Sequence, residues 1–139
     1  MDFIIDLEKL ERGEVEDHTL RDLIRYGCAR DLAVSYSKLG DLAASGGDPA
    51  AARRYYEESL AISRRVAAAA PEDAGCARDL WVSYWRMAVL AERSSDPENA
   101  LTWWRAAHDV LSGLKQAGRF VSPEDEGYLH LLKAKLGLP

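Results

Sequence analysis

Apolar residues recur along most of this chain every three or four positions, which is the spacing of one face of an α-helix. Two series show this best, and each steps by four, three and four positions. They are Leu32, Tyr36, Leu39 and Ala43, and Leu80, Tyr84, Met87 and Ala91. Strands would instead alternate with a period of two. The pattern therefore predicts an all-α protein without strands.

Residues that begin and end helices divide this pattern into six predicted helices. Asp48 and Asp96 suit N-cap positions, and each is followed by a proline that fits the first helical turn. The helices behind them are expected over 49–69 and 97–117. Gly118 provides a left-handed cap for the second of these helices.

Further start and stop signals lie toward both ends of the chain. A short helix is expected over 2–12, where a glycine follows. Thr19, with Asp22 three residues later, resembles a capping box that opens the first long helix. Ser122 precedes a proline and starts a last helix, which is expected to end at Gly137.

An internal repeat organises the chain. The segment Cys28-Ala29-Arg30-Asp31-Leu32 returns as Cys76-Ala77-Arg78-Asp79-Leu80, an offset of 48 residues (76 − 28). Matches continue at that offset: Val34 with Val82, Tyr36 with Tyr84, Leu42 with Leu90, Asp48 with Asp96, Pro49 with Pro97, and Ala52 with Ala100. A helix–turn–helix unit has been duplicated. We divide the chain into an N-terminal capping helix with the start of the first repeat helix (1–27), repeat 1 (28–75), repeat 2 (76–121) and a C-terminal capping helix (122–139).

The residues inside each unit resemble the tetratricopeptide repeat family in its long-period bacterial form. The matching positions are Tyr36, Leu39, Gly40, Ala43, Ala52, Tyr56 and Ser59 in the first unit, and Tyr84, Met87, Ala88, Ala91, Ala100, Trp104 and Ala107 in the second. The sequence departs from the family in its period of 48 instead of 34 residues, and in Ala88, where glycine is usual. The resemblance covers about residues 29–117 and implies a solenoid of helical hairpins with a capping helix at each end.

Length and charge exclude several classes of protein. The chain has 139 residues, with 18 Lys and Arg against 23 Asp and Glu, a net charge of −5. It is too short for a multidomain enzyme. An acidic chain without a basic stripe lacks the counterion release that drives nucleic-acid binding, so we expect no nucleic-acid partner. No apolar run approaches the length of a membrane span, and we expect a cytoplasmic protein without a membrane partner.

Residues that could carry chemistry do not form a recognised site. Cys28 and Cys76 hold equivalent positions on neighbouring helices, whose axes lie about 8–10 Å apart, too far for a disulfide. We expect both to be buried thiols. His18, His108 and His130 lack the spacing of zinc ligands. The sequence therefore predicts no catalytic residue, no metal and no cofactor.

The resemblance also implies a groove, lined by the first helix of each repeat, that binds a partner protein. Its positions here are Val34, Ser37, Lys38, Asp41, Val82, Trp85, Arg86, Val89 and Glu92. Trp85 is our candidate anchor, because an exposed tryptophan between Val82 and Val89 is typical of an interface hot spot. The alternative is that Trp85 and Trp81 are covered by the partner helix or by the C-terminal cap.

One known function of the family does not fit these groove residues. Members that clamp a C-terminal carboxylate use lysine and asparagine where Ser37 and Asp41 stand here. Asp41 would repel a carboxylate, which disfavours such a clamp. With Asp41, Glu92 and the negative net charge, we expect a ligand with an apolar anchor and some basic character.

Three functions remain open from the sequence. The first is a non-catalytic scaffold or adaptor that binds a peptide or helix of another protein in the groove. The second is a homo-oligomerisation module of a larger regulatory or signalling assembly, in which Trp81 or Trp103 meets a second copy, for example in a homodimer. The third is an enzyme or small-molecule receptor, which a thermal-shift screen would detect.

Overall fold

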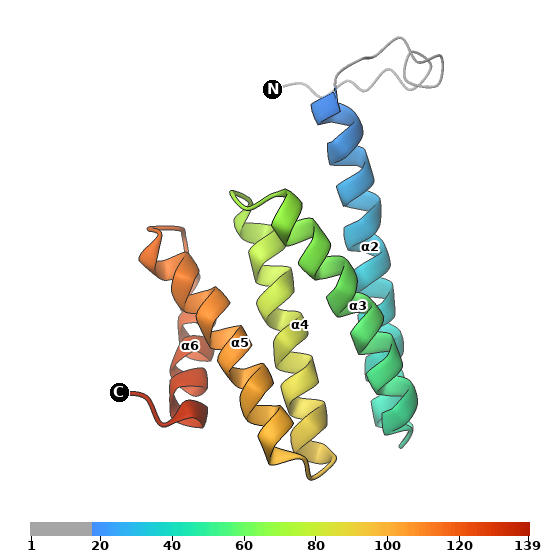
Figure 1. The fold of residues 1–139 in the computed structure, drawn as a ribbon, viewed down its shortest axis with the longest axis vertical. Helices are drawn as coiled ribbons and strands as arrows, with labels where there is room; N and C mark the ends of the chain where they lie inside the picture. The colour runs from blue at the N-terminus through green and yellow to red at the C-terminus, as the bar shows by residue number, and fades with distance from the viewer. Residues whose placement is uncertain (1–17) are drawn as a thin grey trace.

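The computed structural model describes the backbone of residues 18–139 and the side chains of residues 27–139. Five α-helices make up this part of the chain and lie side by side in sequence order (Figure 1). They are α2 (His18–Ser45), α3 (Pro49–Ala69), α4 (Ala74–Arg93), α5 (Pro97–Gln116) and α6 (Pro123–Leu136). The described residues contain no strand, so the predicted all-α class is confirmed for them. The sixth predicted helix, over 2–12, lies outside the described residues.

Most predicted helix ends are confirmed by their capping geometry. Asp48, Asp96 and Ser122 each accept a hydrogen bond from a backbone N–H of the helix that follows, at 3.0, 3.3 and 3.1 Å. Gly118 and Gly137 have φ of 72° and 66°, the left-handed conformation that ends a helix without the steric cost of a Cβ. Helix α5 ends at Gln116, one residue earlier than expected.

The start of the first long helix differs from its prediction. The sequence places an N-cap at Thr19, but α2 already includes His18. Thr19 therefore has helical backbone and lies inside the helix, whereas an N-cap residue has non-helical backbone. The capping box of Thr19 and Asp22 is thus not the start of this helix.

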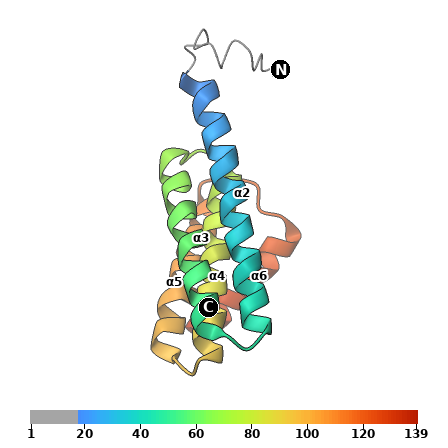
Figure 2. The ribbon, with the colours of Figure 1, turned by 90° about the vertical axis from the view of Figure 1, so that its right-hand side faces the viewer.

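Consecutive helices are antiparallel and pair as hairpins, α2 with α3 and α4 with α5, and α6 packs on α5. Seen from the side, α3 and α5 lie in one layer, and α2, α4 and α6 lie in the other (Figure 2). Side chains also join helices within the second layer. Arg30 of α2 pairs with Asp79 of α4, and Arg78 of α4 pairs with Asp125 of α6.

Small residues allow the paired helices to approach closely. Ala52, Ala88 and Ala100 are at most 2% exposed, and a Cβ placed on Gly40 would overlap the ring of Tyr56. Tyr56 fills the space left by Gly40 in the first hairpin. Trp104, 48 residues later and 2% exposed, has the same place in the second. The prediction that these positions serve packing is confirmed.

The tight contact at Gly40 predicts a large effect of one methyl group. Gly40→Ala should lower the free energy of unfolding by about 1–3 kcal/mol, because the new Cβ collides with the aromatic ring of Tyr56. Gly113→Ala in α5 is the matched control. A Cβ there meets nothing within 4 Å, so this variant should gain up to about 1 kcal/mol from helix propensity. Urea unfolding followed by circular dichroism measures both, and equal effects would contradict the packing described here.

Candidate functional site

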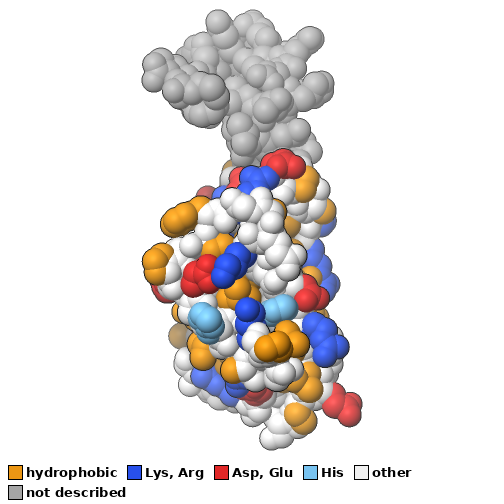
Figure 3. All heavy atoms as spheres, turned by 90° about the vertical axis from the view of Figure 1, so that its left-hand side faces the viewer, with side chains coloured by type: hydrophobic (Ala, Val, Ile, Leu, Met, Phe, Trp, Pro, Cys, Tyr) orange, Lys and Arg blue, Asp and Glu red, His pale blue; other side chains and the backbone are white. Residues whose placement is uncertain are grey.

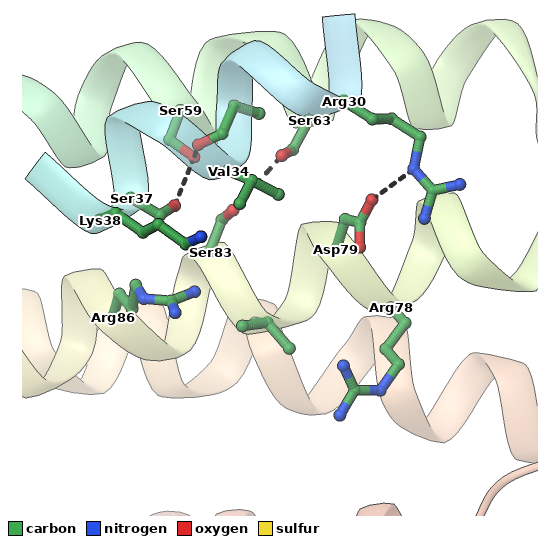
Figure 4. Close-up of a pocket in the computed structure, with 12 residues that line it drawn as sticks. Arg30, Val34, Ser37, Lys38, Ser59, Ser63, Arg78, Asp79, Ser83 and Arg86 are labelled. Atoms are coloured by element: carbon green, nitrogen blue, oxygen red, sulfur yellow. Dashed lines mark hydrogen bonds and ion pairs between the residues drawn. The ribbon is translucent and has the colours of Figure 1, made fainter. Parts of the chain in front are cut away.

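A groove runs between α2 and α4, and α3 forms its floor. Its first part is a hollow of about 230 Å³ that contains side chains from all three helices (Figure 4). Helix α2 contributes Val34 and Lys38 to its wall, and α4 contributes Val82 and Arg86. Figure 4 shows Lys38 and Arg86 near one end of the hollow, with the pair of Arg30 and Asp79 near the other.

A second hollow, of about 220 Å³, adjoins the first at Arg86, which lines both. Asp41 and Tyr56 lie on one side of it, and Trp85 and Val89 on the other. We call the two hollows together the α2–α4 groove. The groove continues along both helices because residues three or four positions apart lie on the same helix face, so successive turns of α2 and α4 each place a residue in it.

Four buried serines form the floor of the first hollow. The hydroxyls of Ser37 and Ser59 are 2.7 Å apart, and Ser59 donates to the carbonyl of Ala33 at 2.8 Å. Ser63 and Ser83 form a second pair at 3.3 Å. Since the Ser59 proton is used on Ala33, Ser37 must be the donor in the first pair. These short side chains satisfy one another and leave the space above them open.

Two ion pairs cross the groove from α2 to α4. Arg30 donates to Asp79 at 2.7 Å, and this hydrogen bond raises the pKa of the Arg30 guanidinium. Arg86 donates to Asp41 at 3.3 Å, and Asp41 also accepts from the Tyr56 hydroxyl. Burial, reinforced by that hydrogen bond, raises the pKa of Tyr56, so the phenol stays neutral and acts as a donor.

More cations line the first hollow than the sequence analysis expected. Four cations line it, Arg30, Lys38, Arg78 and Arg86, against one carboxylate, Asp79. Among the described residues Lys38 makes no ion pair. The two acidic residues that suggested a basic ligand are engaged by cations of the chain, Asp41 by Arg86 and Glu92 by Lys135. Arg30, Arg78 and Arg86 are in turn paired with Asp79, Asp125 and Asp41, so Lys38 is the unpaired charge among the described residues that line the first hollow. The charge of the ligand stays a prediction.

Eight of the nine groove positions proposed from sequence line the two hollows. They are Val34, Ser37, Lys38, Val82 and Arg86 in the first, and Asp41, Trp85, Arg86 and Val89 in the second, which share Arg86. Ser37 is only 7% exposed, so it belongs to the floor. Glu92 lies in neither hollow. Its carboxylate binds Lys135 at 2.9 and 3.1 Å and accepts from the indole N–H of Trp104 at 2.9 Å.

The tryptophans separate into three environments. Trp85 lines the second hollow but also packs edge-on against Trp104 and Tyr128, with ring centroids 4.7 and 5.0 Å apart. Part of its side chain is thus covered by α6, as the alternative interpretation held. Trp103 is half-buried and stacks on Tyr84.

Trp81 does not have the role proposed for it in self-association. It is 2% exposed and packs against Tyr128, with centroids 5.6 Å apart. The Arg78 guanidinium lies over its ring, 5.5 Å from the centroid. A second copy cannot reach this side chain, because α6 covers it. The packing of α6 over this side chain explains the burial.

Two groove residues, Arg30 and Arg78, were missed from sequence. They lie one helical turn before Val34 and Val82 and therefore on the same helix faces. The spacing alone would have included them. The serines of α3 could not have been found in this way, because nothing in the sequence says which face of the second helix forms the floor.

The cysteines also differ from expectation, since Cys76 is buried but Cys28 is exposed. Burial raises the pKa of the Cys76 thiol. No described helix precedes α2 to cover Cys28. Within residues 18–139 we find no cluster of His, Cys, Asp or Glu suited to a metal ion, and no described helix is long and apolar enough to cross a membrane.

No family model matches the sequence, and no similar protein is found among curated proteins or among solved structures. The description of the fold as an all-helical domain of antiparallel hairpins therefore rests on the structure alone.

The environment of Glu92 predicts a pH-dependent effect. The hydrogen bond from Lys135 lowers the pKa of Glu92, so the interaction stabilises the fold above the ordinary glutamate pKa and is lost as the pH falls through the lowered value. Glu92→Gln should lower the urea midpoint at pH 7 and leave it close to wild type at pH 3. Glu57→Gln, in the exposed pair of Arg53 and Glu57, is the control and should change the midpoint little at either pH. An equal loss at both pH values for Glu92→Gln would contradict this account.

Proposed function

We propose that this chain is a non-catalytic interaction scaffold that holds a peptide or helix of a partner protein in the α2–α4 groove. The observation that carries the proposal is the groove itself, two adjoining hollows with apolar walls and a cationic rim. Val34 is 49% exposed although it faces the groove, and Val82 and Val89 lie across from α2. Apolar contact flanked by charge is the composition of a recognition surface.

We further propose that the two hairpins are repeats of tetratricopeptide type. Support comes from the motif residues and from the way equivalent residues pack. Asp48 and Asp96 both cap a helix, and Ala52 and Ala100 are both buried, as are Tyr56 and Trp104. In this reading the first helices of successive repeats form the layer that lines the groove.

The ligand that fits the groove is a segment with an apolar anchor and acidic neighbours. The anchor would lie between Val34 and Val82, and carboxylates would approach Lys38 and Arg86. Lys38 is the strongest candidate contact, because it is exposed and makes no ion pair within residues 27–139. Arg86 would have to share its guanidinium between Asp41 and the ligand.

A homo-oligomerisation module is the second candidate function. Trp81 does not support it, because it is buried, but a row of exposed leucines on α2 does: Leu32, Leu39 and Leu42 are 50%, 43% and 70% exposed. An apolar row of this kind marks a contact surface. Sedimentation of the purified chain over a range of micromolar concentrations distinguishes a monomer from a dimer.

Selection from a displayed library of random peptides tests the groove directly. We expect peptides enriched in Asp and Glu around an apolar residue, and binding that weakens as salt is raised. Lys38→Glu should weaken the selected peptides by about tenfold or more, a loss of about 1.4 kcal/mol. Arg105→Glu, the same charge reversal at an exposed position of α5, is the control and should bind as wild type does.

Circular dichroism must show that both variants remain folded. Equal binding by Lys38→Glu and by wild type, or selection of basic peptides, would contradict the proposed site.

A further inference from the structure

The side of α2 that faces away from the other helices carries an unusual row of residues. Leu32, Leu39 and Leu42 are all large, apolar and exposed, and Cys28 is exposed beside them. Asp31 lies at the edge of the row. We call these five residues the outer face of α2. Figure 2 looks onto α2 from the end of the stack where this face lies.

The chain itself shows what normally covers such a face. The residues 48 positions later are Cys76, Asp79, Leu80, Met87 and Leu90. Cys76, Met87 and Leu90 are only 3%, 5% and 8% exposed, and Leu80 packs against the same cluster as Met87 and Leu90. Three of these positions are therefore buried and two half-buried on α4, whereas all five are exposed on α2.

The cover on α4 is the preceding hairpin. Met87, Leu90 and Leu80 pack with Ala52, Tyr56 and Leu60 of α3. Cys76 packs with Ile62 and Val66, which lie further along the same helix. The second helix of one hairpin thus lies on the first helix of the next.

Equivalent arginines form salt bridges at two successive junctions, one between the two hairpins and one between the second hairpin and α6. Arg30 of the first hairpin pairs with Asp79 of the second at 2.7 Å. Arg78, the equivalent of Arg30, pairs with Asp125 of α6 through two hydrogen bonds, at 2.9 and 3.1 Å. Asp31 stands 48 residues before Asp79. Within residues 27–139 no cation pairs with the Asp31 side chain, so it has the position of the acceptor without the arginine.

From these equivalences we infer that the outer face of α2 docks a helical hairpin of another protein, built like α2 and α3. The partner offers an arginine to Asp31, as Arg30 does to Asp79. It covers Leu32, Leu39 and Leu42 with bulky apolar side chains of its second helix, as Tyr56 and Leu60 do on α4. This surface is separate from the α2–α4 groove, and the inference does not depend on the function proposed for that groove. It replaces self-association through the same leucines, the second candidate function above.

A second copy of this chain does not supply the missing hairpin. Its Arg30 is engaged by Asp79 and its Arg78 by Asp125, so neither is available to Asp31 of a neighbour. The opposite end of the stack is also unsuited. There, hydrophobic side chains are interspersed with charged residues and histidines (Figure 3). The five residues that define the outer face of a second copy include no arginine that could pair with Asp31.

An extended chain tests the inference by supplying the hairpin in the same molecule. A copy of residues 28–75 is inserted directly before Cys28, which reproduces the native junction between Gly75 and Cys76. The original Cys28 then becomes covered, and the inserted Cys28 is exposed. Reaction with a thiol reagent should therefore show one fast thiol out of three, as against one out of two in wild type. Two fast thiols would overturn the inference.

Thermal unfolding gives an independent readout of the same docking. The extended chain should unfold in one transition, with a Tm at least about 10 °C above wild type, because the added unit buries the outer face of α2. Asp31→Arg in the original unit should remove part of this gain, and Arg30→Asp in the inserted unit should restore it. Two separate transitions, or no rescue by the reversed pair, would contradict the proposed contact.

The unextended chain provides the remaining control. Leu39→Glu and Leu42→Glu should leave its Tm within about 2 °C of wild type, because exposed side chains contribute little. A large loss would mean that the chain already covers this face itself. A wild-type dimer that these variants dissociate would mean that a second copy covers it. Either result overturns the assignment to a separate partner.

Discussion

The close approach of antiparallel helices at small residues is the constraint on which this structure depends. Gly40 allows the Tyr56 ring to lie against the backbone of α2, and Ala88 and Ala100 are buried at the corresponding contact between α4 and α5. Because both hairpins close in the same way, their first helices come to lie in one layer. The groove between α2 and α4 follows from that layer, with α3 beneath it as the floor.

Polar interactions then set the character of the surfaces that packing creates. Ion pairs from Arg30 to Asp79 and from Arg86 to Asp41 hold α2 and α4 together without closing the space between them. They neutralise both the carboxylates and the arginines that form them, so Lys38 is the unpaired cation that the described residues bring to the first hollow. The negative net charge of the chain says nothing about this local balance, because electrostatic recognition depends on which charges face the ligand.

Much of the fold could be predicted from the sequence because its signals are local. Capping residues and prolines located the ends of α3 and α6, and the offset of 48 residues identified equivalent positions. The charge of the groove could not be predicted, since it depends on pairs as distant in sequence as Asp41 and Arg86. The burial of Trp81 and the exposure of Cys28 could not be predicted either, because each depends on whether another helix lies beside the residue.

Hydrogen–deuterium exchange, with and without a saturating acidic peptide taken from the library selection, tests the central claim most directly. The account predicts that binding protects α2 around residues 34–41 and α4 around residues 82–89, the segments that line the groove. Exchange in α5, which contributes no residue to either hollow, should not change. Protection confined to α5 or α6, with none in α2 and α4, would contradict the groove as the binding site.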